Sequence, residues 1–450
     1  MNIILNFNYT NSTKIFIVSM KKLISICFLL LTSIACKKPG CTDPFAINYN
    51  SQANKDDGSC EYQIDKSIIS QNITSDKTLS NDTIWTLQRR VAVESGVTLT
   101  IEPGTIIKAV AGTGANASSL IIARGAKIMA QGTPAQPIIF TAESDNIQIG
   151  ETYGSSLNPN VRGLWGGIII LGNAPGSFTG NVESFQIEGI PASDINGLYG
   201  GNDPNDNSGI LSYVSIRHGG AEIGEGNEIN GLTLGAVGIG TIINNVEVVA
   251  NVDDGIEFFG GMVNADHLLV YAQGDDGIDI DQGYSGKISN SLVALTAASD
   301  HALEIDGPEG QMAGSFELDS IVLIGATTNC LPDGVDGEIA DYRKGATGIS
   351  KNIICKDFAL SSDVELDKDV DAISYMNGTL IFEDWIIQNP VDNNGNECFG
   401  IAIDNLFNDK STIGSTFEQD AQNFASFTLD AGVDNFIANK FNWTYYSLYY

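Results

Sequence analysis

A short segment recurs at nearly constant spacing in the middle of the chain, and this repeat limits the folds open to it. The copies occupy 230–234, 254–258, 276–280 and 301–305, so the steps are 24, 22 and 25 residues. Within each copy, apolar and polar residues alternate in the way that is typical of a β-strand. A unit this short cannot bury its apolar side alone, so it has to stack on its neighbours.

Repeats of about 22–25 residues with short strands and polar turns predict an all-β fold, the right-handed parallel β-helix. Leucine-rich repeats have a similar length, but their Leu-x-x-Leu-x-Leu pattern is missing, and propeller blades need about 40 residues. We expect the β-helix over 81–450, after a linker at 64–80. Because the ends of a solenoid expose strand edges, residues 84–87 and the aromatic segment 443–450 are its predicted covers.

The charge balance narrows the possible partners. Asp and Glu number 55 against 23 Lys and Arg, which gives a net charge of -32. A nucleic-acid binder needs basic side chains to replace the counterions of the phosphates, so this class is excluded, and docking on anionic lipid heads is disfavoured. Hydrophobic residues make up 43% of the chain, which is too many for a disordered acidic tail.

The N-terminal region has the features of an export signal. Met20 is followed by two lysines and by an apolar run at 23–31, which is too short to span a bilayer as a helix. We interpret 1–35 as an upstream extension and a signal peptide that starts at Met20. The residues before Cys36 resemble a bacterial lipobox, which implies that Cys36 carries a lipid. The expected location is the cell envelope, as an outer-membrane lipoprotein attached to the membrane only through this lipid.

A small cysteine-bounded unit follows within 36–63. Its Gly-Cys-Thr-Asp-Pro and Asp-Asp-Gly-Ser-Cys ends resemble a module of secreted Bacteroidetes proteins. About 20 residues cannot bury a core, so we expect a disulfide between Cys41 and Cys60. Its Asp and Asn side chains either bind Ca²⁺ or form Asx turns. Farther along, the 25-residue spacing of Cys330 and Cys355 would allow a second bridge and leave Cys398 over.

Several motifs resemble those of a family of Bacteroidetes envelope lipoproteins with a parallel β-helix domain. They include Ile-Glu-Pro-Gly-Thr at 101–105, Gly-Leu-Trp-Gly-Gly at 163–167, Arg-His-Gly-Gly at 217–220 and Asp-Asp-Gly-Ile-Glu-Phe-Phe-Gly-Gly at 253–261. The resemblance covers about residues 75–310 strongly. The family has no settled activity, so the resemblance implies a fold and a location rather than a reaction.

Aligning the copies places many carboxylates on one side of three coils. Alternation turns the apolar residues of each copy inward and Glu257, Asp279 and Glu304 outward, with Asp281 and Asp306 beside them. These five residues are candidate ligands for Ca²⁺, which prefers oxygen. A solvated acidic face and a site with a raised carboxyl pKa are the two alternatives.

One segment also resembles the active site of polygalacturonase-type β-helix enzymes. Asn251-Val252-Asp253, then Asp275-Asp276, then His301 follow the order of that site. The resemblance implies that Asp276 is the acid and that Asp253 and Asp275 are bases, as in inverting glycosidases. His301 lacks its flanking glycines, and no Arg-Ile-Lys follows. Two hypotheses therefore remain. The first is a non-catalytic surface that binds Ca²⁺, a glycan or an envelope protein. The second is a polysaccharide hydrolase or lyase.

Overall fold

The chain divides into two units, Met1–Lys66 and Ser67–Tyr450. The computed structural model describes residues 37–44, 46–61, 67–223, 229–326, 337–392, 394, 396–398 and 402–450. The predicted signal peptide and Cys36 lie outside the described residues. No helix in the described part of the chain is long and apolar enough to cross a membrane.

The described part of the first unit is a small loop closed by the predicted Cys41–Cys60 disulfide. Its polar side chains close turns. Asn50, Asp56 and Asp57 each accept a hydrogen bond at 3.0 Å from the backbone N–H two residues ahead. These contacts are Asx turns, one of the two alternatives that the sequence left open.

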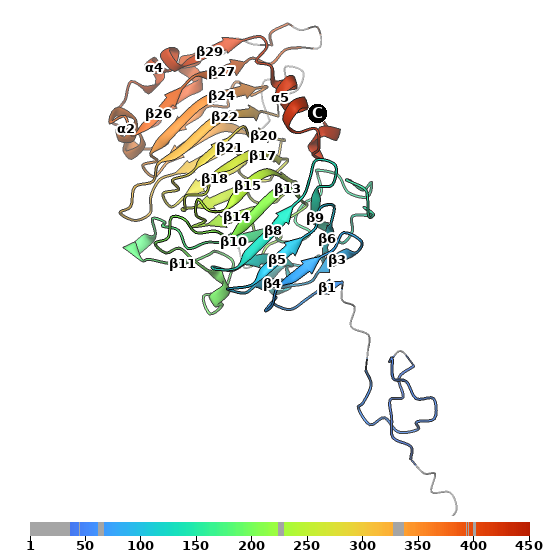
Figure 1. Cartoon of the computed structure of the whole chain (residues 1–450). Helices are drawn as coiled ribbons and strands as arrows, with labels where there is room; N and C mark the ends of the chain where they lie inside the picture. Colours follow the sequence, from blue (N-terminus) through green and yellow to red (C-terminus); the bar gives the residue numbers. More distant parts are fainter. Residues whose placement is uncertain are drawn as a thin grey trace, which may run out of the picture. The chain divides into compact units, whose positions relative to one another are not determined.

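The second unit is a stack of coils whose strands form two long sheets (Figure 1). Neighbouring strands of the ten-stranded sheet all run parallel. From the first coil to the last, this sheet comprises β4 (Arg90–Val93), β7 (Ser119–Ile122), β10 (Ile168–Leu171), β14 (Leu232–Gly235), β16 (Ile256–Phe259), β18 (Ile278–Asp281), β21 (His301–Asp306), β23 (Glu338–Arg343), β25 (Val364–Leu366) and β28 (Phe407–Asp409).

The seventeen-stranded sheet forms the other sides of the coils. Its strands are β1 (Ile68–Ile69), β2 (Lys77–Leu79), β3 (Ile84–Leu87), β5 (Thr98–Ile101), β6 (Ile106–Ala109), β8 (Lys127–Gln131), β9 (Ile138–Ala142), β13 (Gly209–Arg217), β15 (Ile242–Val249), β17 (Ala265–Tyr271), β19 (Lys287–Ser289), β20 (Leu292–Ala294), β22 (Phe316–Ile324), β24 (Gly348–Lys356), β26 (Leu380–Glu383), β27 (Trp385–Gln388) and β29 (Ala425–Thr428). A row of residues with positive φ bends this sheet at one corner. Four of them, Asn245, Asn290, Asn352 and Asp384, are of the types that adopt this conformation most readily.

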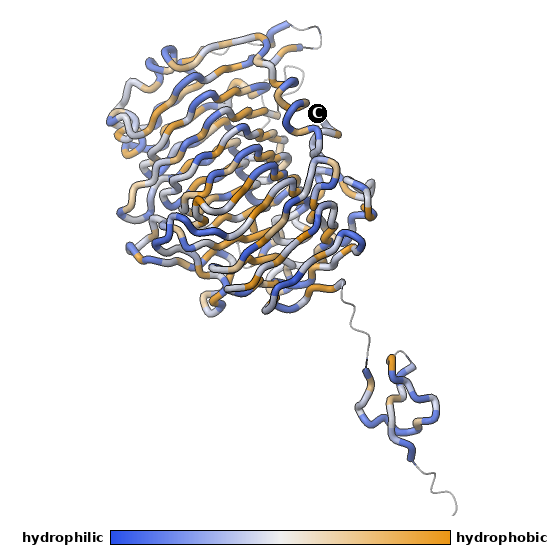
Figure 2. Tube along the Cα trace, viewed as in Figure 1, coloured by the Kyte–Doolittle hydropathy of each residue, from blue (hydrophilic) through white to orange (hydrophobic). Residues whose placement is uncertain are grey.

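Apolar side chains from both sheets fill the interior. Hydrophobic and hydrophilic residues alternate along many of the strands (Figure 2), although β10 is hydrophobic throughout. A continuous apolar cluster runs from Ile69 to Ala425. The predicted parallel β-helix is confirmed. The segment expected to be a linker, 64–80, contains strands β1 and β2. These strands already belong to the β-helix, because they pair with β3 and β5. Residues 84–87 are not the expected N-terminal cover but an ordinary coil strand, β3, which pairs with strands on both sides.

The C-terminal end is closed by short helices rather than by the aromatic segment. The helices here are α2 (Asp369–Met376), α3 (Ile403–Leu406) and α4 (Phe417–Phe424). Phe417 of α4 is fully buried, and its ring lies 5.0 Å from that of Phe382 and 5.7 Å from that of Phe407. The prediction that 443–450 would cover this end is therefore wrong.

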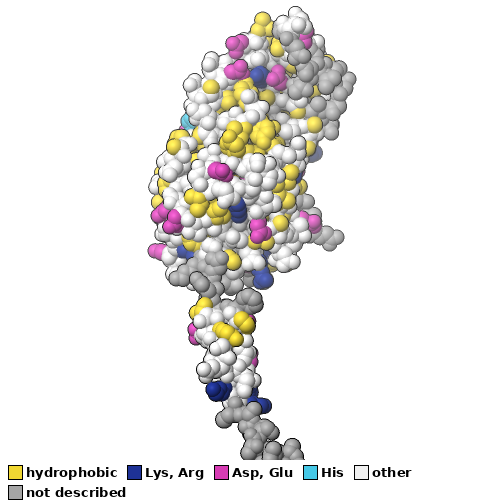
Figure 3. All heavy atoms as spheres, turned by 90° about the vertical axis from the view of Figure 1, so that its right-hand side faces the viewer, with side chains coloured by type: hydrophobic (Ala, Val, Ile, Leu, Met, Phe, Trp, Pro, Cys, Tyr) yellow, Lys and Arg dark blue, Asp and Glu magenta, His cyan; other side chains and the backbone are white. Residues whose placement is uncertain are grey.

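Helix α5 (Val433–Lys440) and the residues after it turn back along the outside of the seventeen-stranded sheet. We call residues 433–450 the C-terminal strap. Val433, Ile437 and Phe441 pack on an outward-facing apolar row that includes Leu269 and Val322. Figure 3 shows the side of the molecule that carries the strap, with hydrophobic patches between the charged side chains.

A buried polar group holds the far end of the strap. Glu247 accepts a hydrogen bond from the backbone N–H of Tyr446 at 2.8 Å and one from the Ser215 hydroxyl at 2.5 Å. The Arg217 guanidinium lies 3.9 Å from Glu247 and 4.6 Å from the centre of the Tyr445 ring. Glu247 is completely buried. The strap thus binds coils that precede it by about 200 residues in the sequence.

The cysteines of the later coils do not form the bridge between Cys330 and Cys355 that their spacing allows. Cys355 is a free, buried thiol, and burial raises its pKa. Cys398 takes part in a disulfide. Cys330 lies outside the described residues.

We predict that Glu247→Ala destabilises the protein by about 3–5 kcal/mol, because it leaves the buried Arg217 charge without its partner. The control is Glu383→Ala, at an exposed position on β26, which should change stability by less than about 0.5 kcal/mol. Urea unfolding followed by circular dichroism measures both. Equal losses in the two variants would contradict a role for Glu247 in holding the strap.

Candidate functional site

On the outer face of the ten-stranded sheet, one residue of each strand lies in register with the next. We call these ten residues the central row. They are, from first coil to last, Ala92, Ile121, Ile169, Thr233, Glu257, Asp279, Glu304, Asp341, Glu365 and Asn408. Neighbours in such a row stand about 4.8 Å apart. The row is apolar in the early coils and acidic in the later ones.

An insertion covers the apolar half of the central row. Residues 172–208 leave the coils between β10 and β13, and they contain the antiparallel pair β11 (Phe185–Gln186) and β12 (Leu198–Tyr199). Phe178, Ile187 and Tyr199 of this insertion belong to the apolar cluster that contains Ala92, Ile121 and Ile169. The Tyr199 ring also contacts Phe259, at 6.2 Å between ring centres. The insertion therefore reaches the place where the row becomes acidic.

The acidic half of the row is mostly shielded from water. Glu257, Asp279, Glu304 and Asp341 are only 5–8% exposed. The sequence correctly placed Glu257, Asp279 and Glu304 outside the interior. The alternative of a freely solvated acidic face is wrong, because these side chains are buried. Each side chain packs between its counterparts in the coils above and below and between the flanking rows, so little of it reaches solvent.

Asp254, Glu257 and Asp279 form a compact buried group, which we call the carboxylate trio. Each offers one oxygen, and these oxygens all lie within 4.8 Å of one another. Burial, followed by the charges of neighbouring carboxylates, raises all three pKa values well above their usual range. Among the described residues, no Lys or Arg forms an ion pair with the trio. Oδ1 of Asp279 is buried and has no hydrogen-bond partner.

The next group couples two carboxyls to a histidine. Asp276 Oδ1 accepts a hydrogen bond from the His301 backbone N–H at 2.8 Å and lies 2.8 Å from Nδ1 of its ring. Burial opposes ionisation of Asp276, but hydrogen bonds from His301 and Glu304 outweigh it, so its pKa is lowered. Burial and the proton shared with Asp276 raise the pKa of Glu304 to about 9.

Two basic residues neutralise the other flank of the row. Arg343 donates to both oxygens of Asp306, at 2.7 and 3.0 Å, and also pairs with Glu304. Lys344 pairs with Asp306. Burial opposes ionisation of Asp306, but these cations outweigh it and lower its pKa. The Asp281 pKa rises to about 7 through burial and the nearby charge of Asp306.

A second acidic group near the end of the row already holds a cation. Glu338, Asp363 and Glu365 come together, and Lys410 Nζ lies 2.7 Å from Glu365 and 3.6 Å from Asp363. Compared with this group, the carboxylate trio stands out because its charge has no basic neighbour in the described part of the chain.

The comparisons with known proteins agree with this architecture. A family model described as a pectate-lyase-like β-helix domain matches residues 71–428. The chain belongs to the pectate-lyase-like β-helix family. No curated protein and no solved structure matches it significantly. Membership in this β-helix family fits a polysaccharide-related role or a binding role.

The structure brings the predicted site residues to one side of this β-helix. Asp253 and Asp275 lie with Asp254 in one acidic group, and Asp276 and His301 lie with Asp300 in another. The register of the aligned copies is correct: Asp254 accepts the Asp276 N–H at 3.0 Å, as Asp276 accepts that of His301. The predicted proton donor is Asp276, but the structure gives the higher pKa to Glu304.

Sequence reasoning missed the later members of the central row, Asp341 and Glu365. Asp341 lies one coil after Glu304 but 37 residues later, because a long connection separates β22 from β23. The signal was present in the strand itself, since 338–343 alternates in the same way as 301–306.

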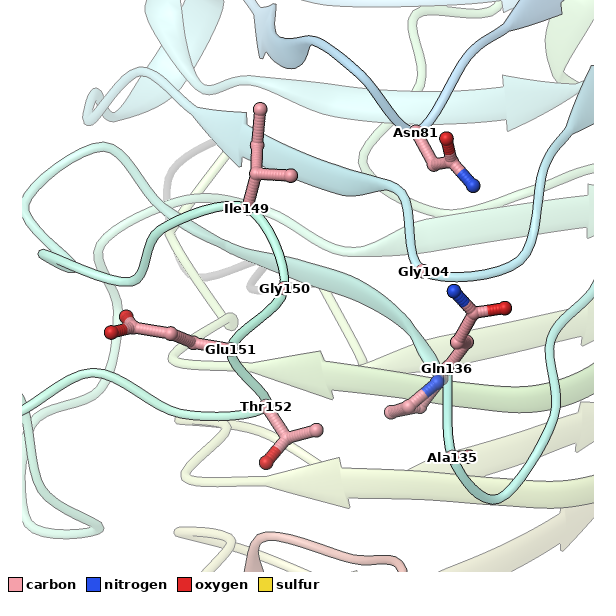
Figure 4. Close-up of a pocket in the computed structure, with 9 residues that line it drawn as sticks. Asn81, Gly104, Ala135, Gln136, Ile149, Gly150, Glu151 and Thr152 are labelled. Atoms are coloured by element: carbon pink, nitrogen blue, oxygen red, sulfur yellow. The ribbon is translucent and has the colours of Figure 1, made fainter.

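A separate hollow of about 220 Å³ lies among the early coils (Figure 4). Its lining includes Asn81, Gln136 and Thr152, and the Glu151 carboxylate points away from the Asn81 and Gln136 amides. It contains none of the predicted site residues.

We predict that His301 titrates near pH 9, because Asp276 holds its proton. Burial lowers the pKa of His301, but the hydrogen bond to Asp276 and nearby carboxylates raise it to about 9 from 6.5. Its contribution to stability is therefore complete below about pH 6.5 and is lost as the pH rises through about 9. In Asp276→Asn, the His301 pKa should fall toward its usual value in an NMR titration.

His218 is the internal control, because its ring contacts the Val161 carbonyl at 2.6 Å and burial lowers its pKa. The His218 titration should be the same in both proteins. If His301 of the wild type titrated near pH 6.5, the pairing would be contradicted.

Proposed function

We propose that this chain is an envelope lipoprotein that binds polysaccharide on the acidic half of the central row, with Ca²⁺ held by the carboxylate trio. The observation that supports this proposal best is the unpartnered, buried Oδ1 of Asp279 among three carboxylates with no basic neighbour in the described chain. Buried acceptors are normally satisfied, so this site favours a bound cation.

The coordination needs of Ca²⁺ would connect the ion to a glycan. Ca²⁺ takes about 6–8 oxygen ligands, and Asp254, Glu257 and Asp279 supply only part of such a shell. Asp281 lies beside the trio and is a candidate for a further ligand, whereas Glu304 and Asp306 are already paired with Arg343. Hydroxyl or carboxylate oxygens of a glycan would complete the shell. An envelope protein with surface oxygens is the alternative partner.

Calcium binding is tested by calorimetric titration of CaCl₂ into protein freed of metal with EDTA. We expect one site, weakened at least about tenfold in Asp279→Asn because a buried ligand loses its charge. The control is Asp384→Asn, an exposed corner residue whose backbone conformation suits Asn. The same proteins are then tested on immobilised polysaccharides with and without Ca²⁺. No heat of Ca²⁺ binding, or glycan binding that ignores Ca²⁺, would contradict the proposal.

Glycan cleavage is the second candidate, and the raised pKa of Glu304 favours it. A carboxyl that stays protonated at neutral pH can protonate the oxygen of a leaving sugar. Its ionised neighbour Asp276 is unsuited as the second carboxylate, because the two share a proton. Glycosidases keep their carboxyls about 5 Å or more apart. The geometry thus favours binding over hydrolysis.

For cleavage, the wild type should release reducing ends from at least one member of a polysaccharide panel. We predict that this release falls at least about 100-fold in Glu304→Gln, the loss expected of a general acid. Glu383→Gln should retain full activity. Product release that is equal in wild type and Glu304→Gln would exclude Glu304 as the acid. No product from any glycan would leave binding as the function.

The proposed location depends on Cys36. We expect the chain to sediment with outer membranes and Cys36→Ala to be recovered in the soluble fraction, because the lipid is the proposed attachment. Metabolic labelling with palmitate provides the second readout. A Cys36→Ala protein that still carries the label, or a wild type without it, would contradict lipid attachment at this residue.

A further inference from the structure

A pocket of about 250 Å³ lies at the opposite, early end of the central row from the carboxylate trio. Its apolar lining includes Ala92 and Ile121, the first two members of that row, both buried. Arg89 and Arg90 are also in its lining, together with Asp194 from the insertion. Two adjacent arginines over an apolar floor are unusual in a chain with 23 basic and 55 acidic residues.

The two arginines are held differently. Arg90 lies 3.5 Å from the Asp194 carboxylate, and both side chains are about 70% buried. The Arg89 side chain is exposed, and its guanidinium makes no ion pair or hydrogen bond with any described residue. The backbone of Arg89 is fixed, because its N–H donates to the Ser118 hydroxyl at 3.0 Å and its carbonyl accepts from Ser119.

Asp194 indicates which chemical group fits this pocket. Its Oδ1 accepts hydrogen bonds from the N–H and the side-chain amide of Asn196, both at 3.1 Å, which orients the carboxylate toward Arg90. One oxyanion of the chain itself thus occupies one arginine, and the second arginine is left open. The planar guanidinium fork binds carboxylate and sulfate groups in the same way.

We propose that this pocket is a binding subsite for a small oxyanion, a carboxylate or sulfate group on a compact, partly apolar skeleton. Arg89 and Arg90 bind the anionic oxygens, and Ala92 and Ile121 contact the skeleton. The volume is smaller than that of pockets for drug-sized ligands, so the subsite takes a single group rather than a long polymer. The pocket is independent of the proposed Ca²⁺ site, because it shares no residue with the carboxylate trio.

The test is NMR-detected titration with sodium sulfate and, separately, with sodium cyclohexanecarboxylate, in EDTA and at constant ionic strength. We expect saturable shifts of Arg89 and its neighbours. Binding should weaken about tenfold or more in Arg89→Ala, which removes a charge-assisted bidentate contact. Arg89→Lys keeps the charge but lacks the planar guanidinium, so its affinity for the anion should lie between those of wild type and Arg89→Ala. Lys127→Ala removes an exposed charge outside the pocket and should bind like wild type.

Asp194→Asn gives the sharper result. The amide still caps its turn but no longer neutralises Arg90, so anion binding should tighten about two- to fivefold. Saturation by only one of the two probes would assign the oxyanion class. Shifts that do not saturate, or that change equally in Arg89→Ala and Lys127→Ala, would overturn the proposal. Asp279→Asn should bind both probes like wild type, so failure here is distinct from failure of the Ca²⁺ site.

Discussion

In a parallel β-helix, each coil places its residues directly above the equivalent residues of the coil before, about 4.8 Å away. Inside the helix this repetition is favourable, because apolar side chains such as Ile256 and Ile278 stack on one another. Outside it, a repeated acidic residue meets its own charge. Two unit charges at this distance repel by roughly 3–4 kcal/mol at an effective dielectric near 20. The acidic half of the central row must therefore reduce its charge.

The structure relieves this repulsion in different ways along the row. Glu304 shares a proton with Asp276, which in turn pairs with His301. Glu304 also pairs with Arg343. Two coils later, Lys410 pairs with Glu365. At the carboxylate trio, no described side chain supplies a cation. The same physical constraint thus produces a neutralised stretch and a stretch that favours protons or a metal ion.

How much of this the sequence could predict depends on whether the information was local. Alternation within each strand and the step of 22–25 residues placed Asp254, Asp276 and His301 on successive coils, and the structure confirms that register. The 37-residue step from Glu304 to Asp341 breaks the period, so the later acidic strands were missed. Which strands are covered by another segment cannot be deduced from local sequence. That the insertion carrying Tyr199 lies over Ile121 and Ile169 follows only from the folded chain, and burial decides the pKa values of the trio.

The C-terminal strap has a consequence for the chain while it is being synthesised. The coils around Glu247, Leu269 and Val322 are synthesised before residues 433–450, which cover them. N-terminal parts of a chain fold first during synthesis. For that interval a row of apolar side chains faces water on coils that are otherwise complete. The exposed row favours association between chains during this interval, and the interval ends when Tyr446 reaches Glu247.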